Sequence, residues 1–312
     1  MTTTKSIPRF AVGLVLVVAL AASVRAADTN AQPGFSTPDD AVAAMVGAMR
    51  RQLPSVLAAI VGPGSQAWLL SGDDVTDRAA MAKFVAAYDE RHAIARSGED
   101  RATVTVGADD WPLPIPLVRS DGRWRFDGAA GNDEVLARRI GRNELETIQV
   151  LQAMADAQVE YARADWGRTG QVAYAQKFAS TPGRHDGLYW PAQAGEPESP
   201  LGPLVAQAAR EGYSHAKVRP YRGYVFRMLK AQGSNAAGGA FDYVVKGAMI
   251  GGFAIVASPI SYGVSGVTTF MINQDAVVYQ KDLGPRTAQA VAAMKRFDPG
   301  PGWTKAPSTR AP

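Results

Sequence analysis

The spacing of apolar residues changes along the chain, and its first part has the spacing of helices. Apolar side chains recur three and four positions apart over residues 38–53 and again over residues 77–96. The first segment has a strong start signal, because Thr37 can cap a helix and Pro38 suits its first position. Asp40 completes a short form of the capping box. The pattern predicts two helices in this part of the chain.

Beyond Gly98 the apolar period becomes two, which predicts β-strands. Ser120, Asp121 and Gly122 separate two of these strands and give the signal of a tight hairpin turn. Helices followed by antiparallel strands predict a compact α+β domain over residues 35–131, similar in outline to the cone-shaped sheet of nuclear-transport-factor-like proteins. The predicted strands are residues 102–106, 115–119 and 123–126.

A long helix and a meander of strands follow. Apolar residues keep helical spacing from about residue 133 to 166, and a loop-rich stretch covers residues 167–220. These elements predict a second α+β domain over residues 132–298, with the long helix packed on an antiparallel sheet, and a flexible tail at 299–312. The apolar stripe of the long helix consists of Leu145, Ile148, Leu151, Ala155, Val159 and Ala162. The later predicted elements are a helix at 203–211, strands at 223–231, 242–246, 251–258, 264–273 and 277–281, and a helix at 287–297.

The first 26 residues have the three parts of a secretory signal peptide. Lys5 and Arg9 form a positive start, residues 10–23 are apolar, and Ala26 ends a small-residue cleavage pattern. The apolar run is shorter than the about 20 residues that a membrane span needs, and no later segment reaches that length. We therefore expect cleavage near Ala26, a short lead-in over residues 27–34, and a periplasmic or secreted protein without an integral membrane segment.

The composition excludes all cysteine-based sites and argues against a nucleic-acid partner. The 312 residues include no cysteine, which excludes disulfides, thiolate metal sites and cysteine nucleophiles. Of the 33 lysines and arginines, Lys5, Arg9 and Arg25 lie in the leader, which leaves 30 basic against 29 acidic residues. The remaining basic clusters are short and carry no interleaved aromatic residues, so a nucleic-acid partner is not expected.

Seven stretches of the chain form specific, word-like motifs. They are FSTPDDAVAAM (35–45), ADDWPLPIPLV (108–118), DGRWRFDGAAG (121–131), RRIGRNELETIQVL (138–151), DGLYWP (186–191), FDYVVKGAMIGGFAIVA (241–257) and YGVSGVTTFMINQDAVVYQKDLG (262–284). Together they closely resemble the bacterial family catalogued as domain of unknown function 2950 (DUF2950), over about residues 35–300. The resemblance implies an exported envelope protein and implies no activity. One local departure is Ala276, whose turn would more naturally hold glycine.

The second domain alone has a weaker resemblance, to the head of a type IV pilin or pseudopilin. A long helix, an irregular loop region and an antiparallel meander follow in the same order. The pilin helix begins with an apolar, membrane-inserted segment, whereas this helix begins with Arg138, Arg139 and Arg142. The resemblance implies a similar fold and does not imply polymerisation as a pilus.

Residues with chemical reactivity are few, and one loop gathers four of them. His185 and Asp186 lie in a glycine-rich loop directly before Tyr189 and Trp190, and loops often carry functional residues. The two aromatic residues can equally serve to pin the loop to the sheet. No nucleophile elbow, histidine-pair zinc motif or dinucleotide-binding glycine motif after a strand is present. We therefore expect no catalytic residue and no cofactor.

Two other groups of residues have a type and position that suit a site. Asp242, Asp275 and Asp282 lie near strand ends of one predicted sheet, where their oxygens suit Ca²⁺, but carboxylates in turns are far more often only solvated. We therefore expect no metal site. A ligand-binding cone in the first domain is the other possibility, and its expected lining consists of Trp68, Tyr88, Trp111 and Trp124.

The leading hypothesis is a non-enzymatic protein of the cell envelope with a role in interaction or assembly, and with another envelope protein as its partner. It rests on an export signal combined with two well-patterned domains that lack a recognisable catalytic constellation. The alternative is an extracytoplasmic hydrolase, or a glycan- or small-ligand-binding protein, whose site is the loop from His185 to Trp190.

Overall fold

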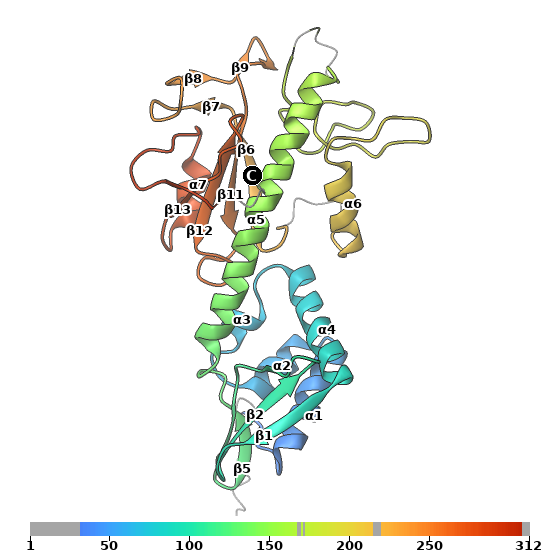
Figure 1. Cartoon of the computed structure of the whole chain (residues 1–312), viewed down its shortest axis with the longest axis vertical. Helices are drawn as coiled ribbons and strands as arrows, with labels where there is room; N and C mark the ends of the chain where they lie inside the picture. The colour runs from blue at the N-terminus through green and yellow to red at the C-terminus, as the bar shows by residue number, and fades with distance from the viewer. Residues whose placement is uncertain (1–31, 167–169, 171, 215–219, 308–312) are drawn as a thin grey trace, which may run out of the picture. The chain divides into compact units, whose positions relative to one another are not determined.

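The computed structural model describes residues 32–166, 170, 172–214 and 220–307. The predicted leader, residues 1–26, lies outside the described residues. The fold is mixed α+β, as the sequence predicts, and its strands pair in antiparallel sheets (Figure 1). Every helix in the described ranges is too short or too polar to cross a membrane.

The helices that open the fold begin with the predicted cap. In front of α1 (Pro38–Arg50), the Thr37 hydroxyl accepts a hydrogen bond from Asp40 N, and the Asp40 carboxylate accepts one from Thr37 N. This reciprocal pair is the capping box that the sequence predicts. The helices that follow are α2 (Pro54–Val61), α3 (Gln66–Leu69) and α4 (Asp74–Glu90).

The second predicted helix ends earlier than expected. The apolar spacing predicts a helix up to residue 96, but α4 ends at Glu90 and β1 (His92–Arg96) follows directly. Arg91 is extended, with φ −162° and ψ 138°. β1 pairs antiparallel with β2 (Arg101–Val106) along its whole length. The prediction is wrong here because long-range pairing decides the conformation of a segment with weak local preference.

The first sheet has the order β1-β2-β4-β5, with β3 paired to β2. Side chains of β2 alternate in burial, so one face of the sheet packs on the helices. The predicted hairpin turn is confirmed between β4 and β5, where Asp121 and Gly122 have φ of 52° and 70°. The other strands of this sheet are β3 (Trp111–Pro112), β4 (Leu117–Ser120) and β5 (Arg123–Phe126).

The long helix is confirmed as α5 (Asn132–Arg163), although its buried face differs from the predicted stripe. Ile148 and Leu151 are buried as expected, but Leu145 is 55% exposed. The buried positions nearest to it are polar. Asn143 Nδ2 donates to Ser265 O (2.9 Å), and Thr147 Oγ1 donates to Asn143 O (2.7 Å), so that both side-chain donors are paired.

The second sheet packs against α5 in the order β14-β13-β12-β11-β6 (Figure 1). All residues of β11 are buried, because α5 and α7 both contact this strand. The strands of the sheet are β6 (Tyr224–Leu229), β11 (Ala254–Pro259), β12 (Thr268–Asn273), β13 (Tyr279–Asp282) and β14 (Thr304–Lys305). The remaining elements are α6 (Gly202–Arg210), α7 (Thr287–Ala293), and the short pairs β7 (Ala231–Gln232) with β8 (Phe241–Asp242) and β9 (Val244–Val245) with β10 (Ala248–Met249).

Two predictions near the C-terminus need correction. The last helix, predicted over residues 287–297, ends at Ala293, and Met294 is extended. The tail predicted to be flexible from residue 299 contains β14, which pairs with β13, and Trp303 packs against the second core. A short segment near a chain end is easily predicted to be disordered, because the strand with which it pairs is not adjacent in sequence.

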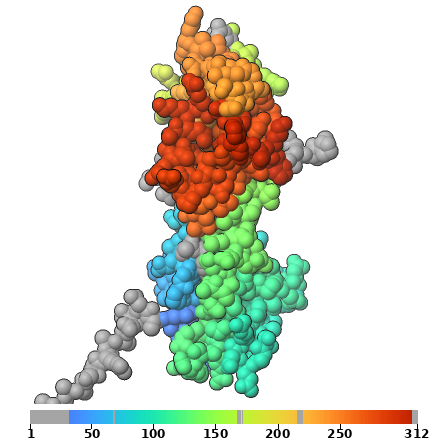
Figure 2. Space-filling view, turned by 90° about the vertical axis from the view of Figure 1, so that its left-hand side faces the viewer, coloured from blue at the N-terminus to red at the C-terminus, as the bar shows by residue number. Residues whose placement is uncertain are grey.

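Two hydrophobic clusters form the interior, and α5 takes part in both. The first core holds α1, α2 and the first sheet, with Val135 and Leu136 packed against it. The second core holds the rest of α5 with β6, β11 and β12. In Figure 2 the green residues run from between the blue and the teal residues up to the orange-to-red part. The predicted domain boundary at residues 131–132 stays a prediction.

Candidate functional site

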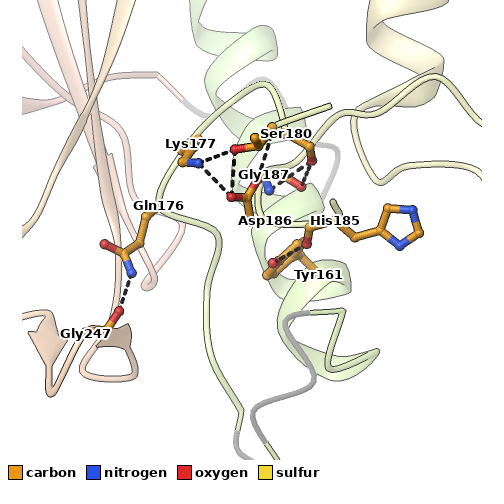
Figure 3. Close-up of polar contacts among 9 residues, drawn as sticks. Tyr161, Gln176, Lys177, Ser180, His185, Asp186, Gly187 and Gly247 are labelled. Carbon is orange, nitrogen blue, oxygen red and sulfur yellow. Dashed lines mark hydrogen bonds and ion pairs between the residues drawn. The ribbon is translucent and has the colours of Figure 1, made fainter. Parts of the chain in front are cut away.

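Asp186 organises the loop in which the sequence places the candidate site. Its carboxylate accepts hydrogen bonds from Lys177 Nζ (2.7 Å), Thr181 N (2.7 Å) and Thr181 Oγ1 (2.9 Å) (Figure 3). The hydrogen bond from Lys177, followed by that from the Thr181 backbone, lowers the pKa of Asp186 to about 2. The carboxylate is therefore ionised at neutral pH and is engaged within its own loop.

The imidazole of His185 points away from Asp186 (Figure 3). It stacks on the ring of Trp190, with 4.2 Å between the ring centroids, and its backbone carbonyl accepts a hydrogen bond from Tyr161 Oη (2.7 Å). The stacking on Trp190 fixes the orientation of the imidazole, and the hydrogen bond from Tyr161 holds the loop against α5. The two side chains therefore do not form an acid–base pair.

Tyr189 and Trp190 line a hollow of about 390 Å³ together with Ser199 and Arg210. Trp190 is 4% exposed, and Ser199 Oγ is buried without a hydrogen-bond partner in the described part of the chain. His185 does not line this hollow, and neither does Asp186. The structure thus brings together two of the four predicted site residues and leaves the other two in structural contacts.

A larger cavity, of about 630 Å³, lies against α4, and we call it the α4 cavity. Its walls come from the helices α1 to α4, from β2 and the segment that follows it, and from the first turns of α5. Its volume falls within the range of about 300–1,000 Å³ that is common for small-molecule sites. Its larger apolar side chains include Met45, Met49, Met81, Phe84, Trp111 and Val135.

Two buried charged side chains, Asp77 of α4 and Arg139 of α5, line the α4 cavity. Their exposures are 5% and 9%. Arg139 Nη2 lies 3.9 Å from Asp77 Oδ1, which is beyond hydrogen-bond distance. Arg139 Nη1 and Asp77 Oδ1 are both buried, and neither has a hydrogen-bond partner among the residues that the structure describes. The ion pair is therefore only loosely made.

The loose contact has a local cause and an electrostatic consequence. Asp77 Oδ2 accepts a hydrogen bond from Ser71 N (2.8 Å), which holds the carboxylate at the start of α4, while Arg139 is fixed on a different helix. Burial raises the pKa of Asp77, against the opposing effects of Ser71 and Arg139. Burial likewise lowers the pKa of Arg139, against the opposing charge of Asp77. Each group is thus short of the partners that a buried charge requires.

One exposed edge of the α4 cavity is formed by Trp111 and Arg138. Trp111 is 40% exposed, and the Arg138 guanidinium carbon lies 5.0 Å from the centroid of its ring. Arg138 Nε also forms an ion pair of 2.6 Å with Glu134 on the same helix. Arg142 and Lys83 line the cavity as well, so its rim carries several cations.

Of the four residues predicted to line a ligand-binding cone, one lines the α4 cavity among the described residues. Trp111 lines the α4 cavity, whereas Trp124 is buried in the first core. Tyr88 stacks on His92, with ring centroids 3.7 Å apart, and does not line the cavity. The side chain of Trp68 lies outside the described residues.

The sequence did not predict Arg139 as a site residue, because it lies in a short basic cluster at residues 138–142. A signal was present. Arg139 lies four residues after Val135 and four before Asn143, on the face by which α5 enters both cores. A charged residue at a core position of a helix is a candidate functional group, because burial of a lone charge is costly.

Asp242, Asp275 and Asp282, whose oxygens suit Ca²⁺, do not form a metal-holding group. In the described ranges no cluster of three or more histidine, aspartate or glutamate side chains has the arrangement of a metal site. Asp282 instead accepts hydrogen bonds from Tyr262 Oη (3.1 Å) and Gly284 N (2.7 Å).

Comparison with known proteins gives a family and no activity. Neither the curated proteins nor the solved structures contain a match. The resemblance to a pilin head is accordingly not confirmed. One family model matches residues 32–306, and it is described as "Protein of unknown function (DUF2950)". This span includes all the motifs that resemble the family, and the chain therefore belongs to the DUF2950 family.

Proposed function

We propose that this protein is a non-enzymatic binding protein of the cell envelope, which holds a small, mainly apolar molecule in the α4 cavity. The observation that carries the proposal is a cavity of about 630 Å³ whose wall combines apolar side chains with a buried, loosely paired charge. Small-molecule sites have this composition, with many apolar contacts and a few polar groups that fix orientation.

The partial burial of the apolar face of α4 supports a ligand site and not only loose packing of the first core. Its apolar face predicts full burial, yet Met81 and Phe84 are only partly buried and line the cavity. Covering apolar surface stabilises a protein by about 25 cal/mol per Å², so an apolar ligand gains free energy by filling this space. The flexible side chains of Met45, Met49 and Met81 can adapt to such a ligand.

The chemistry of the lining supports binding over catalysis. Among the described residues that line the α4 cavity there is no serine, cysteine or histidine, and Thr76 supplies the one hydroxyl group. Thr76 Oγ1 is already hydrogen-bonded to Tyr213 Oη (2.9 Å). A serine or cysteine nucleophile with an adjacent histidine is therefore not found among the described residues of this wall.

A neutral fluorescent probe, N-phenyl-1-naphthylamine, tests the proposal. We expect saturable binding of one probe per chain. Ala80 lines the cavity, so Ala80→Trp fills it and weakens binding by about tenfold or more, which is about 1.4 kcal/mol. Ala86→Trp adds the same side chain at an exposed position of α4 outside the cavity wall and leaves binding unchanged. Absent binding, or equal binding by both variants, contradicts the proposal.

Export and an envelope partner belong to the same proposal and have their own test. The motivating pattern is the charged, apolar and small-residue sequence of residues 1–26. Crosslinking in the cells that produce the protein, followed by fractionation, should recover it in the periplasm or medium, bound to an envelope protein. Recovery of the uncleaved chain from the cytoplasm contradicts this part.

The hollow beside Tyr189 and Trp190 supports a second candidate function, the binding of a glycan. Aromatic side chains next to a buried, unpaired hydroxyl (Ser199) and a cation (Arg210) suit a sugar, which presents both an apolar face and hydroxyl groups. Tyr189→Ala and Arg210→Ala should then weaken retention on immobilised peptidoglycan fragments and leave the thermal melt intact. Arg184→Ala, outside the hollow, is the matched control.

A further inference from the structure

We infer that the molecule held in the α4 cavity is an apolar carboxylate and that its anionic group is bound by Arg139. The inference rests on the proposed function and deepens it, because it assigns the charge of the ligand. Its basis is the unmet hydrogen-bonding capacity of one buried guanidinium, together with the charges around it.

Arg139 has donors to offer. A guanidinium carries five N–H groups and no acceptor, so it needs oxygen atoms around it. Within the described residues its closest anionic neighbour is Asp77, at 3.9 Å from Nη2, and Nη1 is buried without a partner. Buried arginines are normally paired and hydrogen-bonded, because a lone buried charge costs several kcal/mol. A carboxylate supplies two oxygens in the geometry that the guanidinium fork recognises.

Asp77 does not supply the acceptors that the Arg139 guanidinium needs, because its carboxylate is held by the backbone at the start of α4. Its Oδ2 is engaged by Ser71 N (2.8 Å), and Asp77 belongs to the first turn of α4. Arg139 is carried by α5, whose neighbouring residues are fixed in the first core. The distance between the two groups is thus set by two separately anchored helices, and the unpartnered Nη1 of Arg139 is left to a ligand anion.

The remaining charges of the cavity wall favour an anion over a cation. Arg138, Arg142 and Lys83 line the cavity beside Arg139, while its acids are Asp77, Glu90 and Asp109. Arg139 is by far the most buried of the four cations, so its interaction with a ligand charge is the least screened by solvent. The three methionines and Phe84 then accommodate an unbranched or aromatic apolar body.

Three ten-carbon compounds that differ only in their polar end test the inference on the unmodified mature protein. Decanoate, decanol and decylamine compete with N-phenyl-1-naphthylamine, and we expect decanoate to compete at a concentration about tenfold lower than decanol. Equal competition by decanol, or stronger competition by decylamine, overturns the inference and leaves the proposed function standing. If the probe itself does not bind, the proposed function fails.

Two substitutions separate binding from a structural role. Asp77→Asn removes the acid next to Arg139 and should strengthen decanoate binding about threefold while leaving decanol unchanged. A merely structural pair would instead weaken the binding of both compounds. Arg139→Gln should abolish the preference for decanoate. Arg119→Gln removes the same charge from an exposed position outside the cavity and should preserve the preference. Loss of the preference in Arg119→Gln, or its survival in a folded Arg139→Gln protein, contradicts the assignment.

Discussion

The two cores of this fold differ in how completely they close. In the second core all residues of β11 are buried, since α5 and α7 both contact this strand. In the first core α4 has only Val75 and Asp77 buried, and its apolar face borders a cavity. Apolar helical spacing therefore marks a face that avoids water. Whether that face meets protein or a ligand site depends on the neighbouring elements.

Their buried polar groups differ in the same way. In the second core Gln158 Nε2 donates to Ala175 O and Gln158 Oε1 accepts from Ala175 N, both at 2.9 Å. The unpaired buried atoms around that core belong to neutral side chains such as Thr269. In the first core the unpaired atoms belong to the charged groups Asp77 and Arg139. A satisfied buried group stabilises one structure, whereas a buried charge without partners is costly, and the proposed ligand would supply the missing partner.

Two phenylalanines give the largest expected contrast between the cores. Phe270→Ala in β12 removes a side chain that is 1% exposed and should lower the free energy of unfolding by about 3–5 kcal/mol. Phe84→Ala in the wall of the α4 cavity should cost about 1 kcal/mol, because only part of that ring is covered. Urea unfolding, followed by circular dichroism, measures both. Equal losses would show that the first core is closed in solution.

The next contrast concerns the two buried polar pairs. Gln158→Leu leaves the backbone N–H and C=O of Ala175 buried without partners and should cost about 2–4 kcal/mol. The double change Asp77→Leu with Arg139→Met removes both members of the loose ion pair, and such replacements are often neutral or stabilising. We expect the double variant to lose less stability than Gln158→Leu, because only one buried backbone N–H, that of Ser71, loses its acceptor. A loss as large as that of Gln158→Leu would assign the pair a structural role.

Much of the fold was predictable because local signals were strong. The capping box of Thr37 and Asp40, the turn at Asp121 and Gly122, and the long stripe of α5 all depend on residues close in sequence. β1 was not predictable in this way, since its strand conformation depends on pairing with β2. The exposure of Leu145 was not predicted, because polar residues held by hydrogen bonds occupy the buried face of α5 beside it.

The candidate site was less predictable than the fold. Residues 185–190 stand out in sequence by type alone, but two of the four predicted residues are engaged in holding the loop: Asp186 through hydrogen bonds and His185 through a stacked ring. Asp77 and Arg139 are 62 positions apart, and the space between their helices follows from packing that no local pattern encodes. A charged residue at a core position was the one available signal.

Acidic residues of the two regions should respond to pH with opposite signs. The pKa of Asp77 is raised by burial, so the stability it contributes is fully present below its usual pKa of 3.8 and is lost as pH rises through the folded value. The pKa of Asp186 is lowered to about 2, so its contribution is present above 3.8 and is lost as pH falls toward 2. Relative to the unmodified protein, Asp77→Asn should gain stability from pH 3 to pH 7, and Asp186→Asn should lose it. Denaturant unfolding at several pH values checks both, and equal signs contradict the assigned environments.

The smallest contrast lies in the two hairpin turns. The turn between β4 and β5 uses Gly122 at φ 70°, whereas the turn between β12 and β13 has Ala276 at φ 57°, with Ala276 N donating to Asn273 O (3.0 Å). A side chain in this left-handed region costs about 1–2 kcal/mol, partly offset because glycine is freer in the unfolded chain. Ala276→Gly should therefore raise the free energy of unfolding by about 0.5–1 kcal/mol. Gly122→Ala should lower it by a similar amount, since a Cβ there meets no atom within 4 Å and only the backbone is strained. Thermal melts of both variants measure the pair. If Ala276→Gly destabilises the protein, the alanine makes a contact that offsets its strained backbone.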